Sequence, residues 1–477
     1  MYVEKLHLQN IKCFEETEFS FLKEDEKPAK WVTILGENAT GKTTSLQSLG
    51  LLLSGLTETK NLVSDPSSWI RNENRPGRLS FTYSPNKNDF RPVFGGLKSI
   101  LEFNYKTPEH KSNSGFIVIG HIPIELKFNE SFFDPETEEE HLFVEPKIFN
   151  NPGFYEPDID SGFSISDFTF VKGFFVSGYG PFRRLYHGDL LPQIEIPKNE
   201  RHKNFTSLFS EEKPLVAFNQ WVSSLDYRSA KGDGSAEKSL AIGIEALDDL
   251  FPEGVIFDKE SLSATGRVNF LVQGKSIPTL ALSDGYRSVL ALGGDLIWRL
   301  INAFPDSEDP MKEEGVVLID ELDTHLHPRW QAWIAQKLRS AFPNIQFIVT
   351  THSPLVAMGA YWNGETGELR DDVLTLKLEI NDGKASVQRI DDDLAAMDIN
   401  RALESPAFGM VAPRPPEVEK KIDRYDELLE KGERTEGEQT EFQQLQQFMA
   451  EARPIGGKPA PGSLEAKLES YLRRNLP

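Results

Sequence analysis

The hydrophobic positions near the start of the chain follow the spacing of β-strands. Apolar residues alternate with polar ones over residues 2–9, and residues 31–35 (WVTIL) form a short run of β-formers. An apolar helical pattern extends from about Thr43 to Gly55. Since the segment GENATGKTT lies between this run and this helix, the sequence predicts a strand, a glycine-containing loop and a helix in succession.

A second α/β stretch begins near residue 280. Ser283 precedes a helical pattern, and the apolar run GVVLID at 315–320 predicts a buried strand. A helix is predicted over 329–342, and another buried strand over 345–353. A strand, a helix and a strand in this order indicate a parallel sheet.

The long middle segment, from about 60 to 275, differs in residue composition from the two α/β stretches. Phe, Gly, Pro and β-formers dominate it, strand patterns occur at 116–128 and 168–180, and it has no heptad repeat. After a linker with four prolines at 405–417, the spacing predicts two amphipathic helices and a short helix over 464–477. This tail is compatible with a docking element and equally with a hairpin packed on its own domain.

Composition places the chain among cytosolic globular proteins. Hydrophobic residues make up 39% of it and charged residues 26%. The N-terminus lacks the apolar run of a signal peptide, and no window approaches the ~18 apolar residues of a membrane span. Cys13 is the only cysteine, so an intrachain disulfide is impossible, and we expect a cytoplasmic protein without membrane contact.

The charge balance bears on nucleic-acid binding. With 52 basic and 74 acidic residues, the formal charge is −22, and contact with DNA would therefore require a local basic patch. The candidate groups are Arg71 with Arg75 and Arg78, Arg183 with Arg184, and Arg201 with Lys203. Each of them is also compatible with solvated surface or internal salt bridges.

The loop after the predicted strand at 31–35 has the spacing GxxxxGK[ST]. Its residues are Gly36, Glu37, Asn38, Ala39, Thr40, Gly41, Lys42 and Thr43, followed by Thr44. In such a loop backbone N–H groups curl around the β- and γ-phosphates, the lysine supplies positive charge, and the Thr43 hydroxyl is placed for Mg²⁺. The sequence therefore predicts binding of ATP or GTP together with Mg²⁺.

The buried strand at 315–320 runs into two acidic residues, Asp320 and Glu321. Beside a phosphate loop, Asp320 is expected to hold the Mg²⁺ shell, and Glu321 to orient or deprotonate the attacking water. Many strands end in acidic turns, so this pattern becomes specific only because the phosphate loop accompanies it.

Three further motifs occur in the order found in ABC-type ATPases. The first, LSDGY, contains Ser283, Asp284 and Gly285 at the signature position. The second, ELDTHLHP, contains Asp323 and resembles a D-loop. The third, TTHSP, places His352 at the switch-histidine position. Taken singly, Ser283 is compatible with a plain N-cap and His352 with a structural histidine. His325 and His327 have too few partners for a zinc site.

The opening segments LHLQNIKCFEE and WVTILGENATGKTT resemble RecF-type and Rad-type repair ATPases. GYGPFRRL at 178–185, together with the signature, Walker B and switch segments, resembles more closely the PtuA ATPases of Septu anti-phage systems, including retron-associated versions. The resemblance covers most of 1–55 and 165–410. It implies an α/β ABC/RecF-type P-loop ATPase head with a β-rich insertion and a helical C-terminal appendage.

On this basis the chain divides into four parts. They are 1–59 (Walker A part of the head), 60–275 (β-rich insertion completing the first lobe), 276–404 (signature, Walker B, D-loop and histidine switch) and 405–477 (linker and helical appendage). In this class the signature of one subunit covers the nucleotide of another, which implies a homo-oligomer built on ATP-linked dimers. The Septu resemblance also implies an HNH nuclease partner of the PtuB kind.

Several alternatives stay open at this point. About 240 residues without heptads separate the phosphate loop from the signature, which excludes an SMC arm, and neither a Toprim nor an HNH nuclease pattern is present. The segment FFVSGYGPFRRL lacks the glutamine that senses the γ-phosphate in ABC proteins, and Arg183 or Arg184 is a candidate replacement. The rival functions are a RecF-like DNA-repair ATPase and an oligomeric scaffold that holds nucleotide with negligible hydrolysis.

Overall fold

The structure is a computed structural model that falls into two compact units, 1–408 and 409–477. It describes residues 2–54, 61–63, 66–72, 75, 77–84, 97–103, 116–119, 124–134, 139–148, 175–183, 201–211, 215, 218–265, 268–390, 394–409, 416–431 and 434–452. The boundary between the units lies within the predicted linker at 405–417. No helix in these ranges is long and apolar enough to cross a membrane.

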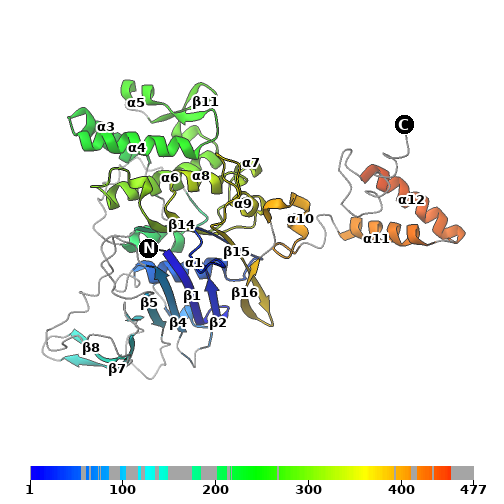
Figure 1. The fold of residues 1–477 in the computed structure, drawn as a ribbon, viewed down its shortest axis with the longest axis horizontal. Coiled ribbons are helices and arrows are strands. Elements are labelled where there is room, and N and C mark those ends of the chain that lie inside the picture. The colour runs from blue at the N-terminus through cyan, green and yellow to red at the C-terminus, as the bar shows by residue number, and fades with distance from the viewer. Residues whose placement is uncertain are drawn as a thin grey trace. The chain divides into compact units, whose positions relative to one another are not determined.

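A six-stranded sheet forms the centre of the first unit (Figure 1). Its strands, in spatial order, are β16 (Lys384–Ile390), β15 (Val373–Asn381), β3 (Trp31–Gly36), β14 (Ile345–Thr350), β13 (Gly315–Ile319) and β9 (Phe175–Tyr179). All neighbours are parallel except β16, which pairs antiparallel with β15. Strands β9, β13 and β14 are buried along their whole length, as expected for apolar runs that are covered on both faces.

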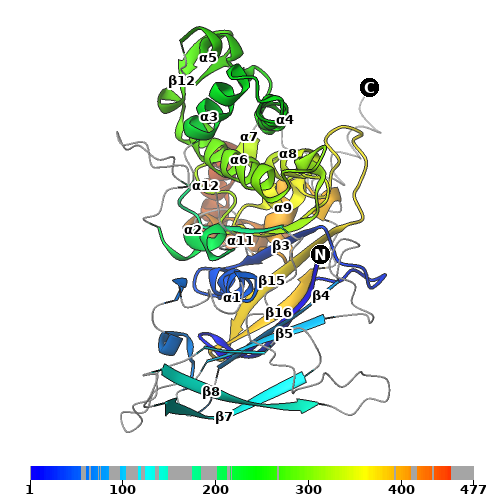
Figure 2. The same ribbon diagram turned by 90° about the vertical axis from the view of Figure 1, so that its left-hand side faces the viewer.

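An antiparallel sheet covers one face of this centre. It contains β2 (Phe14–Ser20), β1 (Tyr2–Ile11), β4 (Gly77–Ser84), β5 (Leu97–Phe103) and β6 (Phe116–Ile119), in this order. Helix α1 (Lys42–Ser54) contributes Leu46 and Leu49 to the core between the two sheets, beside Val32 and Ile34 of β3 (Figure 2). Strands β7 (Ile124–Asp134) and β8 (Glu139–Ile148) form a separate hairpin.

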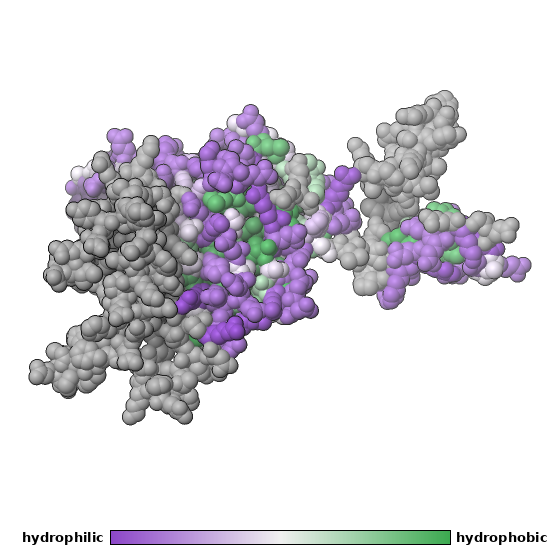
Figure 3. Space-filling view, turned by 60° about the horizontal axis from the view of Figure 1, so that its bottom comes forward, coloured by the Kyte–Doolittle hydropathy of each residue, from purple (hydrophilic) through white to green (hydrophobic). Residues whose placement is uncertain are grey.

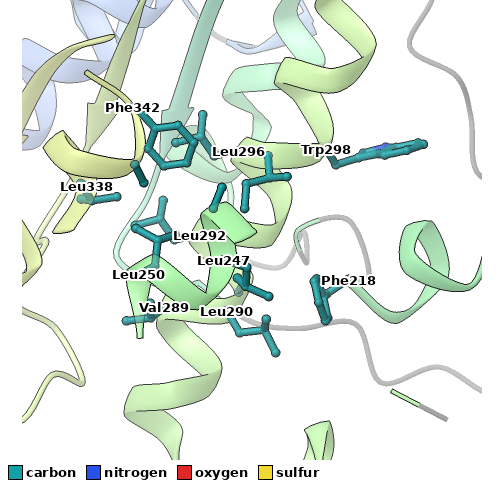
Figure 4. Close-up of a cluster of buried hydrophobic side chains, with 14 of the residues drawn as sticks. Phe218, Leu247, Leu250, Val289, Leu290, Leu292, Leu296, Trp298, Leu338 and Phe342 are labelled. Atoms are coloured by element: carbon teal, nitrogen blue, oxygen red, sulfur yellow. The ribbon is translucent and has the colours of Figure 1, made fainter. Parts of the chain in front are cut away.

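Helices cover the opposite face of the six-stranded sheet (Figure 1). They are α3 (Phe218–Ala230), α4 (Gly234–Leu250), α6 (Asp284–Ala303), α7 (Pro328–Gln331), α8 (Ile334–Ala341) and α9 (Pro354–Gly359). Figure 4 shows Leu247 and Leu250 of α4 packed with Leu292 and Leu296 of α6. The remaining elements are α2 (Thr206–Phe209), α5 (Lys259–Thr265), α10 (Ile399–Glu404) and a small sheet of β10 (Val255–Phe257), β11 (Asn269–Val272) and β12 (Lys275–Pro278).

The expectation of a β-rich segment over 60–275 is wrong for its later part, where 218–250 is helical. Apolar residues recur there at i, i+3, i+4 and i+7, namely Phe218, Trp221, Val222 and Leu225, and all four are buried. This helical spacing was present in the sequence, but the high content of aromatic and β-forming residues masked it. The predicted strand at 116–128 is divided between β6 and β7.

The helix predicted over 329–342 is also interrupted, because the chain turns at Ala332 and Trp333 between α7 and α8. Helix α9 approaches closely at this point. A Cβ atom on Gly359 would lie 2.2 Å from the Ala332 carbonyl oxygen, so only a glycine permits the contact. The interruption therefore lies where a segment distant in sequence approaches the helix, a contact that local spacing does not encode.

The second unit contains α11 (Pro416–Glu430) and α12 (Glu436–Ala452), which confirms the two predicted amphipathic helices. Leu428, Phe442 and Leu445 form their common core, and Arg424 bridges the two helices through Glu441 at 3.0 Å. The short helix predicted over 464–477 lies outside the described residues.

On the face shown in Figure 3, hydrophilic side chains surround small hydrophobic groups.

Candidate functional site

The sequence motifs meet at one edge of the six-stranded sheet. Strands β3, β14, β13 and β9 are parallel neighbours, so their carboxyl ends lie side by side. The phosphate loop follows β3, the switch segment follows β14, and the two acidic residues follow β13. Residues from the start, the middle and the end of the first unit are thus brought to one place, as is usual for ligand sites of open α/β sheets.

The backbone of the phosphate loop has positive φ angles at two residues, one of which is a glycine. Ala39 and Gly41 have φ values of +64° and +102°. A Cβ atom on Gly41 would lie 2.6 Å from Sγ of Cys13 and 2.6 Å from the ring of Phe14. Because these two side chains, in the turn after β1, leave no room for a Cβ atom, position 41 requires glycine. Thr40 closes the loop by donating from its hydroxyl to the carbonyl of Glu37 at 2.9 Å.

Lys42 lies across this loop at the first residue of α1. Its Nζ donates to the carbonyl oxygens of Gly36 and Glu37, both at 2.8 Å, and the residue is buried. Burial lowers the pKa of Lys42, and the carboxylates of Asp320 and Glu321 oppose this effect. The ammonium is therefore held within the loop, next to the N-terminus of a helix that favours anions. Of the other loop residues, Glu37, Asn38 and Ala39 are exposed, and Thr44 is half-buried.

A series of hydrogen bonds joins the phosphate loop to the end of β13. The hydroxyl of Thr43 donates to Oδ2 of Asp320 at 2.7 Å, and the hydroxyl of Thr350 donates to Oδ1 of the same carboxylate at 2.6 Å. The Thr350 hydroxyl oxygen also accepts from the backbone N–H of Glu321 at 2.8 Å. Thr350 thus orients both acidic residues, a role that the sequence did not reveal even though the motif TTHSP contained it.

Thr43 and Asp320 provide the donor set that Mg²⁺ prefers. A hydroxyl and a carboxylate are hard oxygen ligands, and two protein ligands suffice where substrate phosphates and water complete the octahedron. Within the described residues, no group of three or more His, Cys, Asp or Glu side chains could hold a metal ion by itself. The arrangement therefore fits a magnesium ion that binds together with a nucleotide.

Burial raises the pKa of Asp320, and the carboxylate of Glu321 raises it further, whereas the two threonine hydrogen bonds and Lys42 lower it. Since the folded state then binds this proton more tightly than the unfolded chain does, the ligand-free protein loses stability as pH rises through the folded pKa of Asp320.

We therefore expect Asp320→Asn to raise the melting temperature of the ligand-free protein at pH 7.5, and to do so less at pH 5, because the raised pKa lets more of the carboxyl keep its proton at the lower pH. The same change should remove the stabilisation by Mg-ATP, because the metal loses its carboxylate ligand. Differential scanning fluorimetry at both pH values, with and without Mg-ATP, measures these shifts. A lower melting temperature of the ligand-free variant at pH 7.5 would show that the ionised carboxylate stabilises the fold.

Glu321 occupies a strained position. Its φ is +47°, in the left-handed region that a non-glycine residue adopts only when its surroundings impose it. Thr350 accepts from its N–H, and the hydroxyl of Thr324 donates to its Oε2 at 3.1 Å. Backbone and carboxylate are thus both fixed, as a residue that positions a reacting water requires.

Arg183, in the segment after β9, supports the turn that contains Asp320 and Glu321. Its guanidinium donates to the carbonyl oxygens of Asp320 at 3.1 Å and Glu321 at 3.0 Å, with longer contacts to those of Leu322 and Thr324. The side chain is buried, and burial lowers its pKa to about 10, opposed by the carboxylates of Asp323, Asp320 and Glu321.

This geometry changes the interpretation of the predicted basic patches. Arg183 points into the protein and binds backbone carbonyls, so it supports the acidic turn and does not form a surface patch for DNA. Arg71 also donates to the carbonyl oxygens of Cys13 and Gly383, at 3.2 Å and 2.8 Å, but unlike Arg183 it is exposed. Arg184 lies outside the described residues.

The D-loop and the switch segment are connected through Asp323. Its Oδ1 accepts from the hydroxyl of Thr351 at 2.5 Å and from the backbone N–H of His352 at 3.2 Å. The imidazole of His352 is exposed. Asp323 therefore fixes the backbone of the switch segment and leaves the histidine ring accessible.

The signature residues have contacts with α6 and the D-loop. Ser283 caps α6 without a side-chain hydrogen bond, and Asp284 pairs with Arg287. Gly285 lies against the D-loop, where a Cβ atom would be 3.1 Å from the carbonyl oxygen of His325. Among the described residues, no hydrogen bond joins Ser283, Asp284 or Gly285 to the loop at 36–43.

Two family models of AAA domains match this chain. A model described as an AAA domain matches residues 5–122. A second AAA model, whose description names the AbiEii toxin and Type IV TA systems, matches residues 128–358. The two matches contain the phosphate loop, the acidic turn and the switch segment.

Curated proteins similar to this chain include a Septu protein and a retron ATPase. Septu protein PtuA of Bacillus mycoides (strain KBAB4) is 25% identical over 460 residues, which are 95% of this chain and 51% of that protein. The Retron Vc95 probable ATPase of Vibrio cholerae serotype O1 biovar El Tor is 26% identical over 397 residues, 74% of this chain and 71% of the relative. The chain thus spans about half the length of the Septu protein that it matches.

Solved structures with a similar fold include heads of SMC proteins. The Smc head bound to the C-winged helix domain of ScpA has a TM-score of 0.44 and 14% identity, over 82% of this chain and 98% of that one. The SMC head domain from Thermotoga maritima has a TM-score of 0.40 and 12% identity, over 82% of this chain and all of that one (100%).

Proposed function

We propose that this chain, which matches two AAA-domain models and resembles Septu PtuA and a retron ATPase, binds ATP with Mg²⁺, hydrolyses the nucleotide and serves as the ATPase subunit of an anti-phage defence complex. The observation that carries the nucleotide part is the continuous series of hydrogen bonds from Thr43 through Asp320 and Thr350 to Glu321. The Septu and retron relatives support the defence part.

In this mechanism the residues of the site have separate tasks. The N–H groups of the loop at 36–43 and the ammonium of Lys42 bind the phosphates, while Thr43 and Asp320 hold Mg²⁺, which neutralises phosphate charge when bound. Glu321, fixed by Thr324 and Thr350, orients or deprotonates the attacking water. His352 follows β14, and its exposed ring would contact the γ-phosphate of the bound nucleotide.

We further propose that two copies form composite ATP sites, in which Ser283 and Gly285 of one copy complete the site of the other. Support comes from the absence, among the described residues, of a hydrogen bond between them and the loop at 36–43 of their own chain. Their position at the N-terminus of α6, where N–H groups favour an anion, also supports it. ATP would then act as a switch between open and closed dimers.

The partner that this switch controls is proposed to be a small HNH nuclease. A gentle affinity purification of the chain from its own cells, followed by mass spectrometry, tests this proposal. A stoichiometric small nuclease would support the defence-complex function. Recovery of the chain alone, or with DNA and repair proteins, would contradict it and favour a RecF-like repair ATPase.

A further inference from the structure

Gln331, the last residue of α7, joins the D-loop to the switch segment through its side chain. Its Nε2 donates to two carbonyl oxygens of the D-loop, those of Asp323 at 3.3 Å and Leu326 at 2.9 Å. Its Oε1 accepts from the hydroxyl of Ser353, in the switch segment, at 2.8 Å. A single half-buried carboxamide therefore bridges the turn that follows β13 and the turn that follows β14.

The hydroxyl of Ser353 uses all of its hydrogen-bonding capacity at this place. As the N-cap of α9, its oxygen accepts from the backbone N–H groups of Leu355 at 3.1 Å and Val356 at 3.3 Å. A hydroxyl has two acceptor sites and one proton to donate, so its proton is directed to Oε1 of Gln331. Ser353 is also buried, which strengthens these hydrogen bonds. The bridge thus ends on a group whose orientation is already fixed.

The two ends of the carboxamide are not interchangeable. Nε2 faces two carbonyl oxygens, and Oε1 faces a hydroxyl whose proton points toward it. Rotation of the amide by half a turn, or a glutamate at position 331, would place an oxygen against the carbonyl oxygens of Asp323 and Leu326. The hydrogen-bond pattern at position 331 therefore matches glutamine and not its charged counterpart.

This bridge completes the support of the switch histidine. On the N-terminal side, Asp323 accepts from the hydroxyl of Thr351 and from the backbone N–H of His352. On the C-terminal side, Ser353 is held by Gln331 and donates from its own N–H to the Thr351 hydroxyl oxygen at 2.9 Å. The exposed ring of His352 thus projects from a backbone that is anchored at both neighbouring residues.

We propose that Gln331 is a positioning residue for ATP hydrolysis, and that it acts through His352 by holding the switch segment against the D-loop. This role rests on the proposed ATPase function, in which His352 would contact the γ-phosphate. A misplacement of about 1 Å in a reacting group can cost about 10²-fold in rate. The described hydrogen bonds of the Gln331 side chain end in the D-loop and the switch segment, so ATP affinity should depend little on it.

Gln331→Met tests this role in the full chain, since methionine has a similar length and lacks the hydrogen bonds. We expect kcat for hydrolysis of Mg-ATP to fall about tenfold and KM to change less than about twofold, as for loss of an interaction that matters in the transition state. Gln336→Met is the matched control. The side chain of Gln336, in α8, donates to the carbonyl oxygens of Ala332 and Gly359, so this variant should hydrolyse ATP like the wild type.

A double variant separates positioning from a general structural effect. His352→Ala removes the ring through which Gln331 acts, so adding Gln331→Met to it should lower the rate by less than about twofold further. A purely structural contribution would lower the rate by the same factor in both backgrounds. Single-turnover assays with excess protein make the slow rates measurable. Equal factors in the two backgrounds, or a wild-type rate in Gln331→Met alone, would overturn the proposal.

Hydrogen exchange of the amides at 351–356 tests the bridge without hydrolysis. Exchange should be faster in Gln331→Met than in the wild type and unchanged in Gln336→Met, because local opening follows loss of the bridge. Unchanged exchange in Gln331→Met would show that Gln331 does not hold the switch segment. Faster exchange with normal turnover would refute the positioning role alone. A wild-type chain that exchanges as expected but hydrolyses no ATP would refute the proposed ATPase function, and the positioning role with it.

Discussion

Glu321→Gln is expected to lower the rate of ATP hydrolysis by about 10²- to 10⁴-fold, the range that a general base contributes. Glutamine keeps an oxygen that can accept from Thr324 and leaves the backbone contacts with Thr350 and Arg183 in place. The loss therefore reports on chemistry and not on local unfolding. Phosphate release measures the rate, and equilibrium binding of fluorescent ATP should change little.

The same variant tests the proposed dimer. With hydrolysis blocked, ATP should trap two copies together, and light scattering after size exclusion should detect a higher mass only when ATP and Mg²⁺ are present. Glu379→Gln, a surface carboxylate paired with Lys377, is the matched control and should behave like the wild type. Unchanged hydrolysis and no ATP-dependent dimer in Glu321→Gln would show that Glu321 is not the catalytic base, and would favour a static nucleotide-holding scaffold.

Arg183→Met is expected to reduce the free energy of unfolding by about 3 kcal/mol, as removal of one partner from a buried charged network does. Methionine fills part of the volume but leaves the carbonyls of Asp320 and Glu321 without their donor. Urea denaturation measures the loss. Because none of the described hydrogen bonds of Arg183 reaches the phosphate loop, turnover should fall more than ATP affinity, through misplacement of Glu321.

Arg183→Lys distinguishes positioning from charge. An ammonium retains the charge but cannot donate in two directions to neighbouring carbonyls, so turnover should stay well below that of the wild type while stability recovers in part. Arg228→Met is the control, because Arg228 pairs with Asp233 on the surface and is 51% exposed. If Arg183→Lys has full activity, a positive charge alone is sufficient at this position.

The sequence determined much of the nucleotide site by itself. The strand at 31–35, the loop at 36–43 and the helix after it appear where the spacing predicted them, and so does the strand that ends before Asp320. These features are local: glycines permit the loop backbone, a short apolar run makes a buried strand, and helical spacing makes a helix. The parallel sheet then follows from the order of the elements.

Only the tertiary structure decided how residues distant in sequence cooperate. Thr350 orients Asp320 and Glu321 across 30 and 29 residues, and Arg183 reaches the same turn across 137. The close approach of Gly359 in α9 to the Ala332 carbonyl, between α7 and α8, is likewise a contact between separate elements. A hydrogen bond or a close contact between distant segments leaves no periodic signal in a single sequence, because its partner is fixed by strand order and packing and not by spacing along the chain.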